Sequence, residues 1–122
     1  MNAETLVSKA VKAIARITKP GGYGVHIIDT IDHWTYGVPG AGPLDFLKID
    51  PDEPLVHGSN RVRPKEFVNI FERNGFEVLS ANYGNPVPVT LKERSNFLAP
   101  WSAMAIDDLI PTLINIVVRR AC

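Results

Sequence analysis

The pattern of apolar and polar positions begins with a helical period. Over residues 1–18 apolar side chains recur every three or four positions, and most basic side chains fall on the other side. The segment Lys19-Pro20-Gly21-Gly22 ends this helix, because proline cannot continue it and glycine permits a sharp turn. We therefore expect an amphipathic helix whose buried face is formed by Leu6, Ala10, Ala13, Ile14 and Ile17.

Three later segments have the character of β-strands. In residues 23–29 the apolar residues do not alternate cleanly with polar ones, so this strand is expected to be covered on both faces, as in a parallel sheet. Residues 76–83 follow a predicted helix, and residues 113–120 are rich in β-branched side chains. The chain therefore alternates helix and strand, which is typical of an α/β fold.

The segments between these strands predict one helix and one long connection. Pro64 suits the first turn of a helix over residues 63–75, and Asn74-Gly75 suits its end, because glycine accepts the left-handed backbone of a C-cap. Residues 30–62 have no long regular element, although the apolar residues from Leu44 to Ile49 indicate a short anchored segment. A connection of that length more often has a function of its own than serves only to link two elements.

Composition narrows the class of protein. The chain has 122 residues, enough for one domain, and its 13 basic and 13 acidic residues cancel. The absence of a basic stripe argues against a nucleic-acid partner. No apolar run approaches the ~20 residues that span a bilayer, so no membrane association is expected. The single cysteine, Cys122, has no internal disulfide partner and fits a reducing compartment, so a cytoplasmic location is expected.

Several short motifs follow one another in an order typical of one family. They are Lys19-Pro20-Gly21-Gly22 before a strand, then Asp29-Thr30-Ile31-Asp32-His33-Trp34, Leu44-Asp45-Phe46-Leu47-Lys48-Ile49, Asn60-Arg61-Val62-Arg63 and Asn74-Gly75-Phe76-Glu77-Val78. In this order they resemble the C-terminal half of a class I S-adenosylmethionine-dependent methyltransferase. The resemblance covers nearly the whole chain.

The resemblance implies a particular sheet. In that family the last strand runs antiparallel and lies between the two strands before it. We therefore expect an α/β fold in which a partial Rossmann-like methyltransferase sheet has the order 23–29, 113–120, 76–83, with flanking helices. The chain would be a single domain, equivalent to the C-terminal half of the family's fold.

The resemblance also implies that the part holding the methyl donor is absent. The family binds S-adenosylmethionine at a glycine-rich loop after the first strand of its sheet and at an acidic residue ending the second. Gly37, Gly40 and Gly42 are spaced differently and follow no predicted strand. S-adenosylmethionine is thus the expected cofactor of the parent enzyme, and this chain alone is not expected to bind it.

Candidate acceptor-binding residues follow the first predicted strand. In the family the loop after this strand lines the acceptor pocket, so the resemblance implies substrate contacts by Asp29, Asp32, Trp34 and Tyr36. His33 is the candidate general base for an acceptor hydroxyl or amine, because the pKa of histidine lies near neutrality.

The same region allows a metal-dependent hydrolase as a weaker hypothesis, with His26, Asp29, Asp32 and His33 as ligands. On a strand, however, His26 and Asp29 point to opposite faces, so we expect no metal site. The alternative is a half-buried His26 with hydrogen-bond partners and aspartates that cap the loop.

Arg61 and Arg63 are further substrate-binding candidates, because a guanidinium suits a carboxylate or phosphate on the acceptor. The alternative is that both pair with acids near the helix start. Trp101 and Met104 are expected to fill the core rather than to bind a ligand.

The expected sheet leaves strand 23–29 with an uncovered edge, which invites pairing. We expect a homo-oligomer, or docking with the missing N-terminal half, through this edge. The resulting functional hypothesis is the acceptor-binding half of a methyltransferase acting on a small molecule or glycan, inactive alone. The alternative is a non-catalytic interaction module that folds by oligomerisation, so enzymatic activity of this chain is left open.

Overall fold

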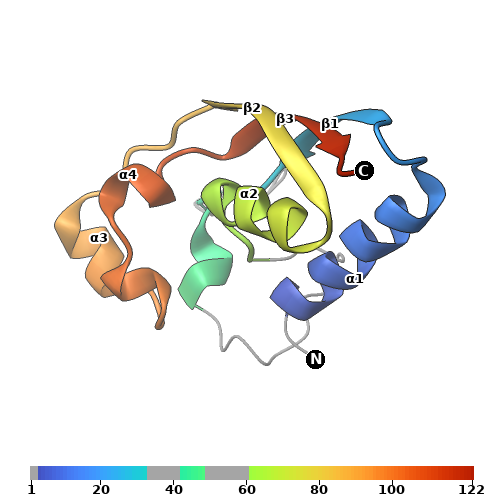
Figure 1. The fold of residues 1–122 in the computed structure, drawn as a ribbon. Helices are drawn as coiled ribbons and strands as arrows, with labels where there is room; N and C mark the ends of the chain where they lie inside the picture. The colour runs from blue at the N-terminus through green and yellow to red at the C-terminus, as the bar shows by residue number, and fades with distance from the viewer. Residues whose placement is uncertain (1–2, 33–41, 49–60) are drawn as a thin grey trace.

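The protein is described by a computed structural model, which covers residues 3–32, 42–48 and 61–122. Figure 1 shows α2 lying across the sheet, with α1 on one side of the molecule and α3 and α4 gathered on the other. The elements in chain order are α1 (Ala3–Ile17), β1 (Tyr23–Asp29), the 3-10 turn η2 (Asp45–Lys48), α2 (Pro64–Arg73), β2 (Phe76–Gly84), α3 (Leu91–Ser95), the 3-10 turn η3 (Trp101–Ala103), α4 (Ile106–Leu109) and β3 (Leu113–Arg120).

The three described strands form one open sheet in the order β1-β3-β2. β3 pairs antiparallel with both neighbours, so β1 and β2 run parallel to each other, with α2 in the connection between them. The predicted strand order and the central, antiparallel last strand are therefore confirmed. The fold is mixed α/β, with helices flanking a three-stranded sheet.

Helices α1 and α2 cover the same face of this sheet. On β3, Ile114, Ile116 and Val118 alternate with more exposed residues and are completely buried. They pack with side chains from both helices, and the cluster consists of Val11, Ala15, Val62, Phe67, Ile70, Phe71, Phe76, Ile114, Ile116 and Val118. This cluster is the main core of the protein.

A second apolar cluster lies away from α1. It contains Phe46 and Leu47 of η2 together with Phe97, Trp101 and Leu109, and Met104 packs against it. The predicted short anchored segment is thus η2, and the expectation that Trp101 and Met104 fill the core is confirmed.

The ends of α2 follow from its sequence. Pro64 stands in the first turn, and the Glu66 carboxylate accepts a hydrogen bond of 2.8 Å from the Arg63 backbone N–H. Gly75 follows the helix with φ of +91°, a left-handed conformation that glycine adopts without a Cβ clash. This end of the helix leads directly into β2.

The predicted buried face of α1 is largely wrong. Ile17 is 85% exposed, and Leu6, Ala10 and Ala13 are also exposed. Ile14 does pack against the core, but its companions there are Val7, Val11 and Ala15. The helix carries two apolar stripes, and the sheet contacts the one that was not predicted.

The expectation that β1 is covered on both faces is also wrong for the part of the chain that the structure describes. The strand alternates, with His26 and Ile28 partly buried on the side of the helices. Val25 is 69% exposed and Ile27 is 72% exposed. Apolar composition predicted burial, but α1 and α2 both lie on the opposite face.

Candidate functional site

The carboxyl end of β1 leads into a cluster of buried polar residues. The Thr30 N–H donates to the Thr112 carbonyl at 2.8 Å, which continues the pairing with β3. The Asp32 N–H donates to the Pro43 carbonyl at 2.8 Å, which brings the segment with η2 against the strand end. The buried polar residues here are Thr30, Asp32, Arg61, Arg63 and Thr112.

Arg63 connects three elements at this point. Its Nη2 donates to the Thr30 carbonyl at 2.6 Å, and its Nε donates to the Arg61 carbonyl at 3.3 Å. The guanidinium carbon lies 5.2 Å from the centre of the Phe46 ring, within the range of a cation–π contact. One side chain thus connects three parts of the chain, which are the end of β1, the residues that precede α2, and the turn η2.

The charge of Arg63 is held in the protein interior. The residue has an exposed fraction of 0%. Burial lowers the pKa of its guanidinium to about 10, while the nearby Glu66 carboxylate raises it. The side chain is therefore still a cation at neutral pH, and much of its stabilisation comes from backbone carbonyl dipoles.

Two polar atoms of this cluster have hydrogen-bonding capacity left. Arg63 Nη1 and Thr30 Oγ1 are both buried and have no hydrogen-bond partner among the residues described. A buried unpaired donor is costly, so such atoms need an explanation. A cationic donor and a hydroxyl near the end of one strand are suited to bind an anionic or carbonyl oxygen.

Arg61 has a structural contact of the same kind. It is buried, and its Nε donates to the Phe46 carbonyl at 2.9 Å. Arg61 and Arg63 therefore both donate to backbone carbonyls near the end of β1 and near η2. The nearby Glu66 carboxylate also stabilises the charge of Arg63.

The structure separates Asp29 from Arg63. Asp29 is on the exposed face of β1, and its Oδ1 accepts a hydrogen bond of 3.1 Å from the Ile31 N–H. This is the predicted loop-capping role for the aspartate. Asp32, in contrast, is buried beside the segment that carries η2. His33, Trp34 and Tyr36 lie outside the described residues.

His26 does not join Asp29 in a metal site. Its ring packs 5.1 Å from that of Phe71 on the helix-covered face, opposite to Asp29. Burial lowers the pKa of the imidazole, and its Nε2 lacks a hydrogen-bond partner in the described residues. Within those residues, no group of three or more histidine, cysteine or acidic side chains is arranged to hold a metal ion.

The described residues do not fit S-adenosylmethionine. Gly42 belongs to a tight local turn in which its N–H donates to Asp45 Oδ2 at 2.7 Å. A Cβ added at Gly42 would lie 3.1 Å from Asp45 Oδ1, so the turn explains the glycine without a ligand. Gly37 and Gly40 lie outside the described residues, and β1 continues into Thr30-Ile31-Asp32 rather than a glycine-rich turn.

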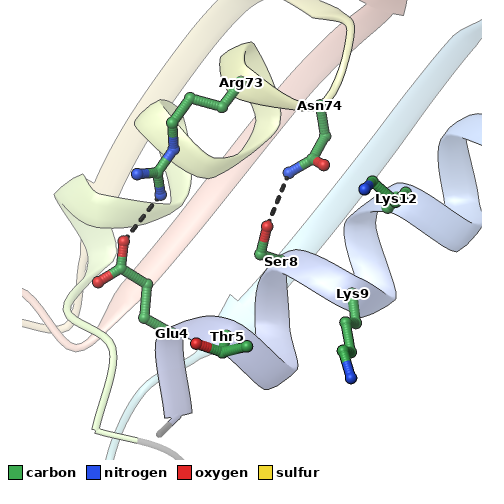
Figure 2. A pocket seen from close by; sticks show the side chains of 7 residues that line it. All are labelled: Glu4, Thr5, Ser8, Lys9, Lys12, Arg73 and Asn74. Carbon is green, nitrogen blue, oxygen red and sulfur yellow. Dashed lines mark hydrogen bonds and ion pairs between the residues drawn. The ribbon is translucent and has the colours of Figure 1, made fainter. Parts of the chain in front are cut away.

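A separate open groove of about 600 Å³ lies between α1 and α2. Figure 2 shows Arg73 reaching Glu4 and Asn74 reaching Ser8 across it, at 2.8 and 3.1 Å, while Lys9 points away from α2. These contacts hold α1 against α2. Because the charge of Arg73 is paired with that of Glu4, the groove does not form a site for an anion.

Sequence reasoning did not include Thr30 and Phe46 in the site. The position of Thr30, directly after a predicted strand, is a signal that could have included it, because ligands of α/β sheets bind at the carboxyl ends of strands. The stacking of Phe46 on Arg63 depends on the path of the chain between them and has no local signal.

Comparisons of the chain with protein-family models, curated proteins and solved structures found no match. Among the described residues, no helix has the length and apolar character needed to cross a membrane.

Proposed function

We propose that this chain supplies the acceptor-binding half of an S-adenosylmethionine-dependent methyltransferase that acts on a small molecule or glycan. The proposal is supported most strongly by the strand order β1-β3-β2, with the last strand antiparallel and central. That order is the one implied by the motifs from Lys19-Pro20-Gly21-Gly22 onward. The segments occupy the places in the sheet that the resemblance assigns to them.

The buried polar cluster supports the location of the acceptor site. Arg63 Nη1 and Thr30 Oγ1 would bind an oxygen of the acceptor near the end of β1, where both atoms are buried and unpaired within the described residues. His33 would remove a proton from the acceptor, and Trp34 and Tyr36 would form an aromatic wall. Methyl transfer requires mainly that the acceptor be held in line with the methyl group.

S-adenosylmethionine would supply an electrophilic methyl group in the complete enzyme. The described residues of this chain do not fit it, so we propose that a separate donor-binding half holds it. Asp29 and Asp32 remain proposed acceptor contacts, with Asp32 on the buried side and Asp29 on the exposed side of the strand end.

Reconstitution tests the proposal. The chain would be mixed with a separate polypeptide that carries the donor-binding half of such a methyltransferase, and binding of S-adenosylmethionine would be measured by calorimetry. We expect no binding to the chain alone and clear binding to the mixture. Transfer of a radioactive methyl group would then be measured with a panel of hydroxyl-, amine- and carboxylate-bearing small molecules and oligosaccharides.

Two threonine variants separate the site from general stability. Thr30→Val removes Oγ1 but keeps the backbone carbonyl that Arg63 binds, so it should raise the KM for the acceptor severalfold. Thr18→Val removes a hydroxyl whose partner is the Ile14 carbonyl of α1, and should leave KM unchanged. Tight binding of S-adenosylmethionine by the chain alone, or no methyl transfer by any mixture, contradicts the proposal.

The second candidate function is a non-catalytic module that folds by oligomerisation. The exposed apolar residues Val25 and Ile27 favour it, since such a face of a sheet is normally covered. If this candidate is correct, the chain associates with a partner, while the reconstituted mixture neither binds the donor nor transfers a methyl group.

A further inference from the structure

The edge of β1 offers backbone groups for pairing. The Thr30 N–H donates to Thr112, and the Arg120 N–H donates to the Gly22 carbonyl, both at 2.8 Å and in register with the β1–β3 ladder. In an antiparallel pair, bonding positions alternate, so the even-numbered residues of β1 face β3. The N–H and C=O groups of Tyr23, Val25 and Ile27 therefore point to the open edge of the sheet.

Apolar side chains surround this edge on both faces of the sheet. Glu4 and Ser8 of α1 contact α2, and Val11 faces the core. At 100° per residue, the stripe of Leu6, Ala10, Ala13 and Ile17 lies on the side of α1 turned away from α2. Five of the nine large exposed apolar residues of the described chain belong to this side, namely Leu6, Ile17, Tyr23, Val25 and Ile27.

This surface is complementary to itself. When two copies of the α1 stripe lie antiparallel, Leu6 meets Ile17 of the other copy and Ala10 meets its Ala13. When two copies of β1 pair antiparallel about His26, Val25 meets Ile27 and Tyr23 meets Asp29. Each residue of β1 meets a residue with the same orientation in the strand, and Asp29, the acidic residue of the strand, meets Tyr23.

One twofold axis can pass through the centres of both patterns. The centre of the α1 stripe lies about 8 Å from Ile17 along the helix, at 1.5 Å per residue. His26 lies about 10 Å from Tyr23 along the strand, at 3.3 Å per residue. Because only residues 18–22 separate α1 from β1, both centres lie at a similar distance along the chain from this connection.

Paired strands would lie about 4.8 Å apart across the axis. Packed helices approach each other to about 8–10 Å. Ala10 and Ala13 at the centre of the stripe leave room for this approach.

We propose that the α1 stripe and the β1 edge form a twofold interface with a second copy of this chain. The interface joins the two sheets into a single sheet of six strands. The five large side chains together expose on the order of 600 Å² per copy, and the part of this area that the partner covers would contribute to the ~800 Å² that each partner buries in a standard interface. The proposal does not depend on the methyltransferase function, although a donor-binding half would compete for the same edge.

Analytical ultracentrifugation of the full chain over a dilution series tests the dimer. We expect a reversible monomer–dimer equilibrium and a shift to monomer in Ala10→Glu, which places a carboxylate in the helix contact. Ala10 is exposed in the single chain, so this variant should keep its fold and circular dichroism spectrum. The matched control is Leu91→Glu, which changes an apolar residue that is 67% exposed on α3 and should leave the dimer intact.

Cross-linking tests the register. In a Cys122→Ser background, a short thiol cross-linker should join Val25→Cys copies to Ile27→Cys copies several times more efficiently than it joins either variant to itself. If Val25→Cys cross-links to itself more efficiently than to Ile27→Cys, the twofold axis does not pass through His26. A chain that stays monomeric at all concentrations, including one that binds only the donor-binding polypeptide, would overturn the dimer while leaving methyl transfer by the mixture as a separate result.

Discussion

At the scale of single residues, Arg63 is the side chain on which the candidate site depends. Its hydrogen bonds reach backbone carbonyls of two segments, Thr30 and Arg61, and its cation stacks on Phe46. The resemblance made Arg63 a substrate-binding candidate, and the structure places its guanidinium at the end of β1. Its burial was not predicted, because an arginine between a loop and a helix start has no local signal that separates an exposed from an enclosed guanidinium.

Replacement of Arg63 should destabilise the fold. Arg63→Met keeps much of the apolar stem but leaves two buried carbonyls without their donors, which should cost about 2 kcal/mol in the free energy of unfolding measured with urea. Arg73→Met is the control, because its exposed ion pair with Glu4 should contribute less than about 1 kcal/mol. Equal stability of the two variants would contradict the central role of Arg63.

His26 should make stability depend on pH. Burial lowers the pKa of its imidazole below the ordinary value of 6.5, so below that pH the unfolded chain binds more protons than the folded one. Stability should therefore fall as the pH drops from 6.5 through the folded-state pKa. The free energy of unfolding of wild type minus that of His26→Leu should show this pH dependence without contributions from other groups, because those groups titrate in both proteins. A difference that is constant with pH would show that His26 is not buried as described.

At the scale of elements, the sequence predicted which segments form helices and strands better than which faces they bury. Strands β1 and β3 have clear local signals in β-branched residues, and α2 has them in Pro64 and Gly75. On α1, two apolar stripes compete, and only contacts with the sheet select Val11 and Ala15 over Leu6 and Ala10. Burial of a face depends on a partner element, which a periodic pattern does not contain.

The end of α2 allows a test of one local signal. Gly75 has φ of +91°, so Gly75→Ala introduces a strained backbone and should lower the free energy of unfolding by about 1 kcal/mol. Gly84→Ala is the control, since Gly84 has no positive φ and its added Cβ would meet Leu113 at an ordinary 3.6 Å. Urea unfolding of both variants measures the difference, and a loss in Gly84→Ala as large as that in Gly75→Ala would contradict the argument.

At the scale of the whole molecule, the described residues cover the sheet on one face and leave it open at β1. Apolar residues were expected to be buried on β1, and the residues that contradict this, Val25 and Ile27, are the ones that border the open edge. The mismatch between composition and exposure marks the place where a further protein surface is expected. The resemblance attributes it to a donor-binding half, and the symmetry of the surface attributes it to a second copy.

Hydrogen exchange should show this open side directly. The amides of His26 and Ile28 face β3 and should be protected at every protein concentration. The amides of Val25 and Ile27 face the edge, and should exchange rapidly in dilute samples and slowly in concentrated ones. Measurement of exchange rates by NMR at two protein concentrations tests whether protected and edge-facing amides alternate along β1. Rapid exchange of Val25 and Ile27 at both concentrations would contradict pairing through β1.

The opposite edge of the sheet limits how far such pairing can extend. Between Val78 and Ser80 the register of β2 against β3 shifts, so Leu79 is an extra residue that interrupts the strand. Filaments grow when every subunit offers two compatible edges, and the sheet of the described residues has one regular edge and one broken by the bulge. In the proposed dimer, joining at β1 uses the regular edge of this sheet, and the irregularity at Leu79 would keep a protein with an exposed apolar sheet face from growing into fibrils.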